Sequence, residues 1–237
     1  MKRYQRQMIL SEIGVTGQQK LSTASVLVVG AGGLGVVVAS YLVAMGIGHV
    51  GICDFDDIEE SNLHRQFCYM PDDIGQKKAT VLSKKLRVQN PAINITDFNQ
   101  KVDKETISSI AENYQLICDC TDQGHVRMVI NNYCAALKKP LVHGAVSNWE
   151  GYLTIFHYKK NFSLNDLFDF SDYLKIENCN EMGINSAVCG LIGSYMTNET
   201  LKIALNLDQV LEGKIMYINA LNNQFKTFTI KKRQTKP

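Results

Sequence analysis

The sequence lacks the features that mark disordered, highly charged or membrane-spanning chains. It has only 4 prolines in 237 residues, no low-complexity tract and an apolar content of 45%. This composition excludes a disordered chain except at the ends, and the length is enough to bury the core of one domain. The charges nearly balance, with 25 Lys and Arg against 23 Asp and Glu, so nothing in the charge indicates a nucleic-acid partner.

The cysteines also lack the spacing of a metal site or a disulfide framework. The 7 cysteines form no CxxC pair, and no secretory signal precedes them. Cys118 and Cys120 are too close together for a zinc knuckle. We therefore expect reduced thiols, a cytoplasmic location and no zinc site. The apolar run over residues 26–53 is broken by glycines, which favours a buried strand and helix over a membrane span.

The pattern along the chain alternates between short apolar strands and longer helices. Residues 26–29, VLVV, read as a strand that ends in GAGGLG, and an apolar helix over 36–45 and a second strand over 50–53 follow. The alternation continues with a helix over 76–88, a strand over 93–96, a helix near 103–111, a strand over 116–118, a helix over 126–137 and a strand over 141–142. It predicts an α/β fold, a doubly wound, mostly parallel, Rossmann-like sheet.

The pattern changes after Gly151. The strand-like YLTIF is followed by a polar and aromatic loop over 159–178, then by a long apolar helix from about residue 187 to 205. The segment KIMYINALNNQFKTFTI then predicts an antiparallel hairpin of C-terminal strands that caps the sheet. We expect residues 1–237 to form a single domain.

The glycine motif indicates a nucleotide. Gly30, Gly32 and Gly35 form G-x-G-x-x-G after a strand and at the start of a helix, where the backbone can approach a phosphate at the helix N-terminus. Asp54 ends the next strand about twenty residues on, where a carboxylate can accept hydrogen bonds from ribose hydroxyls. This motif alone does not distinguish NAD from ATP.

Charged residues farther along the chain favour ATP. Arg65 follows Asp54 by eleven residues, and Lys77 and Lys78 come next; Asp122 follows a third apolar strand. The carboxyl ends of parallel strands meet in one crevice, so these side chains should converge there. Hydride transfer in an NAD-dependent dehydrogenase does not require these cations, whereas a reaction at a triphosphate requires them to bind phosphate oxygens. Each could instead be a solvated surface charge, and for Lys77 that alternative is equally acceptable.

Eight motifs occur in a fixed order: RYQRQMIL, GAGGLG, DFD, SNLHRQ, GQKKA, DCTD, GYLTIF and CGLIGSYMTNETLK. Together they resemble the ThiF/MoeB/HesA family, the bacterial relatives of ubiquitin-activating enzymes, from Arg3 to about Ile230. The resemblance implies an adenylyltransferase that uses ATP and Mg²⁺ to activate the C-terminal glycine carboxylate of a small ubiquitin-fold sulfur-carrier protein, releasing pyrophosphate. Thiamine, molybdopterin or a related thiolation pathway would use such a carrier, which ends in Gly-Gly.

The resemblance also implies an organisation of the chain and a homodimer. Residues 1–25 correspond to an N-terminal helical dimerisation segment, 26–145 to the nucleotide-binding half and 146–237 to the carrier-binding or cap half. The residues that match nucleotide-binding positions are Gly30, Gly32, Gly33, Gly35, Asp54, Asp56, Asn62, Arg65, Gln66, Lys78 and Asp122. Asp54 matches the ribose-binding acid.

Five residues match positions close to the reaction: Arg65, Lys78, Asp122, Arg6 and Cys179. Asp122 matches the acid associated with Mg²⁺. Arg6 matches an arginine supplied across the dimer interface into the neighbouring site. Cys179 aligns with a cysteine that some members use to take up the activated carrier or sulfur, and the alternative is a loop thiol without a task.

The chemistry of adenylation explains why no histidine is needed. A C-terminal carboxylate has a pKa of about 3.5, so it is ionised at neutral pH without a general base. Cations instead offset the repulsion between this anion and the nucleotide. We therefore assign His64 to packing or to the support of its neighbours, and His49, His125, His143 and His157 receive no function.

The sequence departs from many relatives where they carry two CxxC pairs that hold zinc. NFSLNDLF and ALNNQF stand at these places, so we expect no zinc and a loop packed by Phe162, Leu164, Leu167, Phe168 and Tyr173. Two alternatives to carrier activation remain. One is adenylation of a peptide or of a carboxylate borne by tRNA, the second of which the near-neutral charge disfavours. The other is a pseudoenzyme that binds a carrier without catalysis.

Overall fold

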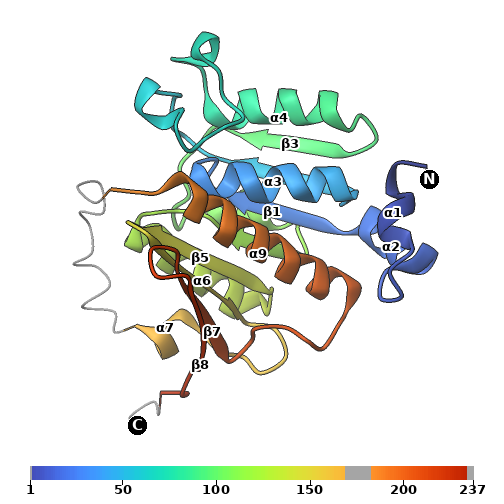
Figure 1. The fold of residues 1–237 in the computed structure, drawn as a ribbon, viewed down its shortest axis with the longest axis vertical. Coiled ribbons are helices and arrows are strands. Elements are labelled where there is room, and N and C mark those ends of the chain that lie inside the picture. The colour runs from blue at the N-terminus through green and yellow to red at the C-terminus, as the bar shows by residue number, and fades with distance from the viewer. Residues whose placement is uncertain (1, 169–182, 234–237) are drawn as a thin grey trace.

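One sheet organises the whole protein (Figure 1). The computed structural model describes residues 2–168 and 183–233. The described part contains an 8-stranded sheet in the order β3-β2-β1-β4-β5-β6-β7-β8. The strands are β1 Ser25–Val29, β2 His49–Cys53, β3 Asn94–Phe98, β4 Leu116–Asp119, β5 Leu141–Ser147, β6 Glu150–Phe156, β7 Lys214–Asn219 and β8 Gln224–Thr229.

The sheet changes direction at β5. Strands β3, β2, β1, β4 and β5 pair in parallel, whereas β6, β7 and β8 extend the sheet in antiparallel fashion. The parallel strands are joined by helical crossovers, as parallel pairing requires. The predicted doubly wound sheet with antiparallel C-terminal strands is confirmed.

Helices cover both faces of the sheet. They are η1 Lys2–Tyr4, α1 Gln5–Met8, α2 Gly14–Thr23, α3 Gly33–Met45, η2 Glu60–Asn62, η3 Pro71–Asp73, α4 Lys78–Gln89, α5 Ile107–Ala111, α6 Gly124–Leu137, α7 Leu164–Leu167 and α9 Ser186–Leu205. One core packs α3, α4 and α9 against the sheet, and a second core packs α5, α6 and α7 against the opposite face. The central parallel strands β1 and β4 are therefore buried from both sides, which is why they are mostly apolar, whereas the edge strand β3 is only partly buried and carries Asn, Thr and Asp.

The two longest helices of the first face, α3 and α9, lie side by side (Figure 1). Gly193 permits this approach, because a Cβ there would lie 2.7 Å from the Cβ of Val37. α3 is apolar all round because it is enclosed between the sheet and α9. The run over residues 26–53 is thus a strand, a helix and a strand, and no helix in the described ranges has the length and hydropathy to cross a bilayer.

Several element boundaries differ from those expected. β5 continues to Ser147 because β6 pairs with it along its full length. The helix expected near 103–111 begins only at Ile107, because the Asp103 carboxylate accepts hydrogen bonds from the amides of Glu105 and Thr106 and holds a turn. The helix expected from residue 76 begins at Lys78.

The segment expected as a loop over 159–178 contains the short helix α7. Leu164 is buried in the second core, and Phe162, Leu167 and Phe168 pack against it as expected. Tyr173 lies outside the described residues. The described part of this segment therefore fills a local core.

Candidate functional site

The glycine loop between β1 and α3 is shaped by two close approaches. Gly30 has a φ of +93°, and a Cβ there would lie 2.8 Å from the carbonyl oxygen of Cys120. A Cβ on Gly35 would lie 1.8 Å from the carbonyl oxygen of Gly30. Only glycine satisfies both positions. The loop therefore folds back on the start of α3 and presents its amides there, the arrangement that favours a phosphate.

Asp54 lies at the edge of this loop. One of its carboxylate oxygens accepts a hydrogen bond from the amide of Ala31 at 2.6 Å, and the other accepts one from the amide of Asp56 at 2.8 Å. Burial raises the pKa of Asp54, and the hydrogen bond from Ala31 and the charge of Lys78 offset this only in part. A desolvated carboxylate gains from further donors, and ribose hydroxyls are such donors.

Lys78 is the first residue of α4 and is almost completely buried. Its ammonium group lies 3.0 Å from a carboxylate oxygen of Asp56. The hydroxyl of Tyr69 lies within hydrogen-bonding distance of the carbonyl oxygens of Ala31, at 2.9 Å, and Lys78, at 3.2 Å. Tyr69 thus ties the start of α4 to the glycine loop. The sequence alone does not predict this function of Tyr69, because a single tyrosine in a loop belongs to no recognisable motif.

Arg65 is oriented by its neighbour His64. Its Nη1 donates to the carbonyl oxygen of Ser61 at 3.0 Å and to Nε2 of His64 at 2.8 Å. His64 Nδ1 lies 3.1 Å from Oγ of Ser186, which donates to the His64 carbonyl at 2.7 Å. In this arrangement Nε2 of His64 accepts from Arg65, and Nδ1 faces the hydroxyl of Ser186. Both Nη1 hydrogens of Arg65 are used, and in the described ranges its Nε and Nη2 have no partner.

The placement of Arg65 puts a cation beside the glycine loop. A Cβ on Gly33 would lie 3.5 Å from Cγ of Arg65 and 2.9 Å from Sγ of Cys189 in α9. The unused edge of the guanidinium can therefore bind two oxygens of one anion in fork geometry. The expectation that His64 supports its neighbours agrees with these contacts.

Gln66 and Asn62 serve this loop differently. Gln66 is buried, its Oε1 has no partner in the described part of the chain, and its Nε2 would lie 3.7 Å from a Cβ on Gly32. A buried polar atom without a protein partner at this place is suited to a hydrogen bond with a bound ligand or water.

The Asn62 side chain accepts a hydrogen bond from the amide of Glu59 and caps η2. Its visible contribution is to the shape of the loop.

Asp122 lies in the loop from β4 to α6 and is exposed. This loop touches the glycine loop through Cys120 and Gly30. The residue before Asp122, Thr121, donates hydrogen bonds from its amide and its hydroxyl to the buried carboxylate of Asp119, at 3.0 and 2.7 Å. The sequence analysis gave Asp119 no function, because it follows the strand expected over 116–118 as the first residue of DCTD; β4 in fact includes it.

Arg6 is not brought to this site within one chain. It lies exposed on α1, which is held against the far end of α3 by a hydrogen bond of 2.8 Å from Gln7 to the carbonyl of Met45. The 13 residues of α3 separate the two ends by roughly 20 Å. Figure 1 shows α1 and α2 at the edge opposite the carboxyl end of β1. Cys179 lies outside the described residues.

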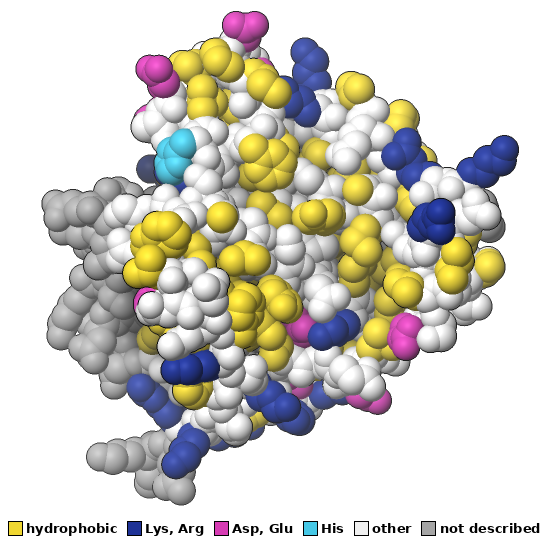
Figure 2. All heavy atoms as spheres, in the orientation of Figure 1, with side chains coloured by type: hydrophobic (Ala, Val, Ile, Leu, Met, Phe, Trp, Pro, Cys, Tyr) yellow, Lys and Arg dark blue, Asp and Glu magenta, His cyan; other side chains and the backbone are white. Residues whose placement is uncertain are grey.

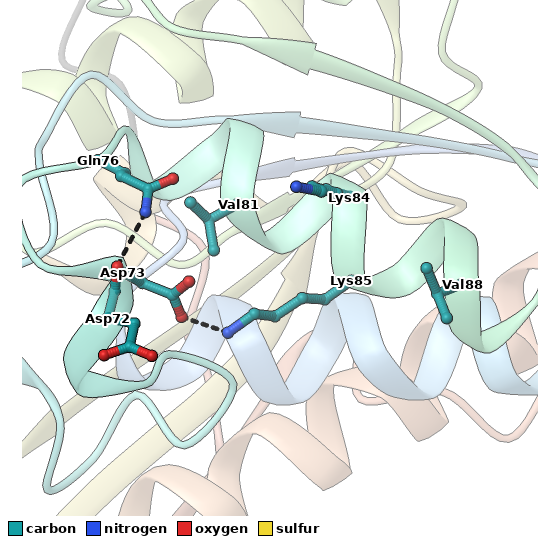
Figure 3. A pocket seen from close by; sticks show the side chains of 7 residues that line it. All are labelled: Asp72, Asp73, Gln76, Val81, Lys84, Lys85 and Val88. Carbon is teal, nitrogen blue, oxygen red and sulfur yellow. Dashed lines mark hydrogen bonds and ion pairs between the residues drawn. The ribbon is translucent and has the colours of Figure 1, made fainter.

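Two surface hollows of about 450 Å³ each are lined by residues other than the site residues described above. One runs along the outer face of α4 (Figure 3), and an ion pair between Lys85 and Asp73 crosses it. The other is apolar and lies over α3 and α9, where Figure 2 shows hydrophobic side chains gathered. Its lining residues are Val37, Tyr41, Phe67, Ala187, Gly190, Leu191, Ser194 and Tyr195.

The described residues hold no cluster of three or more His, Cys, Asp or Glu side chains that could bind a metal ion by themselves. The expected lack of a zinc site stays a prediction. A lone carboxylate such as Asp122 can still hold Mg²⁺ together with nucleotide phosphates, because Mg²⁺ takes few protein ligands and keeps oxygen donors of substrate and water.

Comparisons with known proteins agree over nearly the whole chain. The model of the ThiF family matches residues 4–237. The adenylyltransferase and sulfurtransferase MOCS3 of Caenorhabditis briggsae is 39% identical over 236 residues, which are 99% of this chain and 59% of that protein. The sulfur carrier protein adenylyltransferase of Thermus thermophilus is 35% identical over 243 residues, covering 100% of this chain and 90% of that protein.

The chain spans only about half to three fifths of the curated MOCS3 relatives that it matches. Among solved structures, E. coli MccB with AMPCPP and MccA has a TM-score of 0.85 at 21% identity, covering 97% of this chain and 72% of that chain. At this level of identity the likeness shows the fold alone.

Proposed function

This chain belongs to the ThiF family, and on that premise we propose that it is an adenylyltransferase that activates the C-terminal carboxylate of a small sulfur-carrier protein. The observation that carries the proposal is the meeting of Asp54, Lys78 and Arg65 around one glycine loop. A ribose-binding acid with two cations beside a phosphate cradle suits ATP better than a nicotinamide dinucleotide. The names of the relatives supply the acceptor.

The residues of the site fit the needs of this reaction. The acceptor carboxylate is already ionised at neutral pH, with a pKa of about 3.5, so the obstacle is repulsion between anions. The fork of Arg65 and the ammonium of Lys78 are placed to offset negative charge at the phosphates, and the backbone amides of the glycine loop add further donors. Mg²⁺ held beside Asp122 would supply additional positive charge at the phosphate oxygens when ATP is bound.

The carrier is proposed to dock on the half formed by residues 146–237. Exposed apolar side chains occur on β8 and in the β5–β6 and β7–β8 turns, where Trp149, Leu221, Phe225 and Phe228 are 47 to 61% exposed, and Phe225 and Phe228 point to opposite faces of β8. Such side chains are more typical of a docking surface than of a free sheet edge. Residues 26–145 would then bind the nucleotide. The described cysteines are all unpaired, which supports the expected cytoplasmic location.

A homodimer would complete the site. Arg6 lies on α1 at the Met45 end of α3, and the glycine loop lies at the other end of this helix, about 20 Å long, so Arg6 would act in the site of a second copy. The apolar hollow over α3 and α9, with Tyr41 50% and Phe67 59% exposed, offers a surface that a second copy would cover. Residues 1–25 would contribute to the same interface.

Mixed dimers test whether Arg6 acts across the interface. We expect Arg6→Ala and Lys78→Ala to be inactive alone but to recover about a quarter of wild-type exchange when mixed and allowed to re-form dimers. In a mixed dimer, the site with an intact Lys78 receives the intact Arg6 of its partner. Exchange of pyrophosphate measured before and after mixing gives the recovery. A mixture that stays inactive, with mixed dimers demonstrated by mass spectrometry, would place Arg6 outside the reaction.

The proposed function itself is tested by ATP–pyrophosphate exchange with Mg²⁺ and small Gly-Gly-ending carriers from the same genome. We expect exchange that requires both the protein and an intact carrier C-terminus. A carrier shortened by its last glycine is the control. Exchange with an unrelated peptide but with no carrier would instead establish a peptide acceptor. Carrier binding without exchange would establish a pseudoenzyme.

A further inference from the structure

A second group of polar residues lies buried behind the Asp122 loop, outside the residues expected to touch ATP. Asp119, the last residue of β4, has no exposed surface. One of its oxygens accepts the two hydrogen bonds from Thr121, and the other lies 2.8 Å from Nδ1 of His143. His143 is equally buried and stands beside Asp119 in the register of β4 and β5. Its Nε2 lies 3.4 Å from the hydroxyl of Tyr152 on β6.

The environment assigns the charges of this pair. Burial alone would raise the pKa of Asp119, but the hydrogen bond from His143 and the positive charge of Arg127 bring it below its ordinary value. Burial lowers the pKa of His143, more than the neighbouring Asp119 raises it. The carboxylate is therefore ionised and the imidazole neutral. His143 donates from Nδ1 to Asp119, and its Nε2 accepts from Tyr152.

Hydrogen bonds hold Thr121 at three groups: its amide, its hydroxyl and its carbonyl. Asp119 holds its amide and its hydroxyl, and Arg127 of α6 donates from Nε to its carbonyl oxygen at 3.0 Å. The next residue is Asp122. A backbone held on both sides of Thr121 restricts where Asp122 can lie, and this same loop approaches the glycine loop where the carbonyl of Cys120 meets Gly30.

We propose that Asp119 and His143 are positioning residues that hold Asp122 in place through Thr121. This proposal rests on the proposed function, since it concerns the carboxylate that would face Mg²⁺ and ATP. A buried carboxylate used only for packing would direct its oxygens into the core. In this protein, Oδ1 of Asp119 accepts both of its hydrogen bonds from Thr121, the residue that precedes Asp122. Groups that orient a metal ligand typically change metal affinity by about 10- to 100-fold when they are removed.

Thr121 allows a matched test, because valine keeps its shape without the hydroxyl and serine keeps the hydroxyl. In Thr121→Val we expect the Mg²⁺ concentration for half-maximal exchange to rise about tenfold. The KM for the carrier should stay unchanged, and Thr121→Ser should behave as wild type. Thermal unfolding of each variant serves as the control for folding.

Two readouts do not depend on turnover. The first is ATP affinity measured with and without Mg²⁺, where the gain due to Mg²⁺ should shrink in Thr121→Val but not in Thr121→Ser. The second is the ¹⁵N spectrum of His143, which should show a proton on Nδ1 and a neutral imidazole at pH 7. Asp119→Asn should alter this spectrum.

The outcomes separate the two proposals. Wild-type protein that binds Mg²⁺ with ATP but exchanges with no acceptor would overturn the proposed function alone. A Thr121→Val variant with unchanged Mg²⁺ dependence in both exchange and ATP binding would overturn the positioning proposal. So would a spectrum that shows His143 protonated on Nε2 or charged at neutral pH.

Discussion

Replacing Lys78 by alanine is expected to reduce ATP–pyrophosphate exchange by about 10²- to 10³-fold, the usual effect of removing one group aimed at developing negative charge. Lys78 is almost completely buried at the start of α4 and lies 3.0 Å from Asp56, next to the residues that hold the glycine loop. Its charge cannot be replaced by a mobile side chain from the surface. Initial rates of exchange at saturating carrier measure the loss.

Lys77→Ala is the matched control for Lys78→Ala. Lys77 is the preceding residue, but its side chain is exposed and pairs with Asp57 at 2.8 Å. We expect its exchange rate to stay within about twofold of wild type, because surface ion pairs contribute little. Equal losses in both variants would mean that general positive charge, rather than the buried ammonium, matters. Full activity of Lys78→Ala would remove this residue from the proposed site. Carrier binding should survive in both variants.

Replacing Gly35 by alanine is expected to destabilise the fold by about 2–3 kcal/mol and to abolish ATP binding. The new Cβ would lie 1.8 Å from the carbonyl oxygen of Gly30, and that atom is backbone. The glycine loop must then move away from α3, so the phosphate cradle is lost together with the packing. Urea unfolding gives the stability, and titration with ATP gives the affinity.

Gly32→Ala separates these two effects. Its Cβ would meet nothing nearer than Nε2 of Gln66 at 3.7 Å, an ordinary contact. We expect unchanged stability but weaker ATP binding, because a methyl group on the open side of the loop occupies space that a phosphate needs. A stable Gly32→Ala protein with wild-type affinity would show that ATP does not approach the loop at this residue. A stable Gly35→Ala protein would contradict the close contact described.

Much of this fold follows from local patterns in the sequence. The alternation of short apolar strands with amphipathic helices predicts the doubly wound sheet, and the glycine motif predicts the loop that Gly30 and Gly35 shape. The length of β5 was underestimated because its second half pairs with a strand whose position the sequence does not state. The sequence predicts a helix at Asp103 because no glycine or proline marks a turn there. The turn is instead held by the Asp103 carboxylate, which accepts a backbone hydrogen bond.

The site was predictable where residues share a motif and not where they meet across strands. Asp54 and Arg65 belong to motifs, and the structure places both beside the glycine loop. Asp119 and His143 are 24 residues apart and meet only because β4 and β5 are neighbours in register. Asn62 shows the limit of a motif: the sequence matches it to a nucleotide-binding position, the structure shows its side chain capping η2, and its contact with a phosphate stays a prediction. Motif membership does not reveal where a side chain points.

The change of strand direction at β5 has a consequence for how the molecule folds. The hairpins β5–β6 and β7–β8 join segments that are close along the chain, and such hairpins form in about 1–10 μs. Parallel strand pairs form more slowly, because the long crossover between the two strands must close before they can pair. The pairing of β4 with β5 connects the slowly forming parallel strands to the rapidly forming hairpins. It also brings Asp119 next to His143. The proposed nucleotide site is therefore built on the slower parallel pairings, and the proposed carrier-docking strands are built on the faster hairpins.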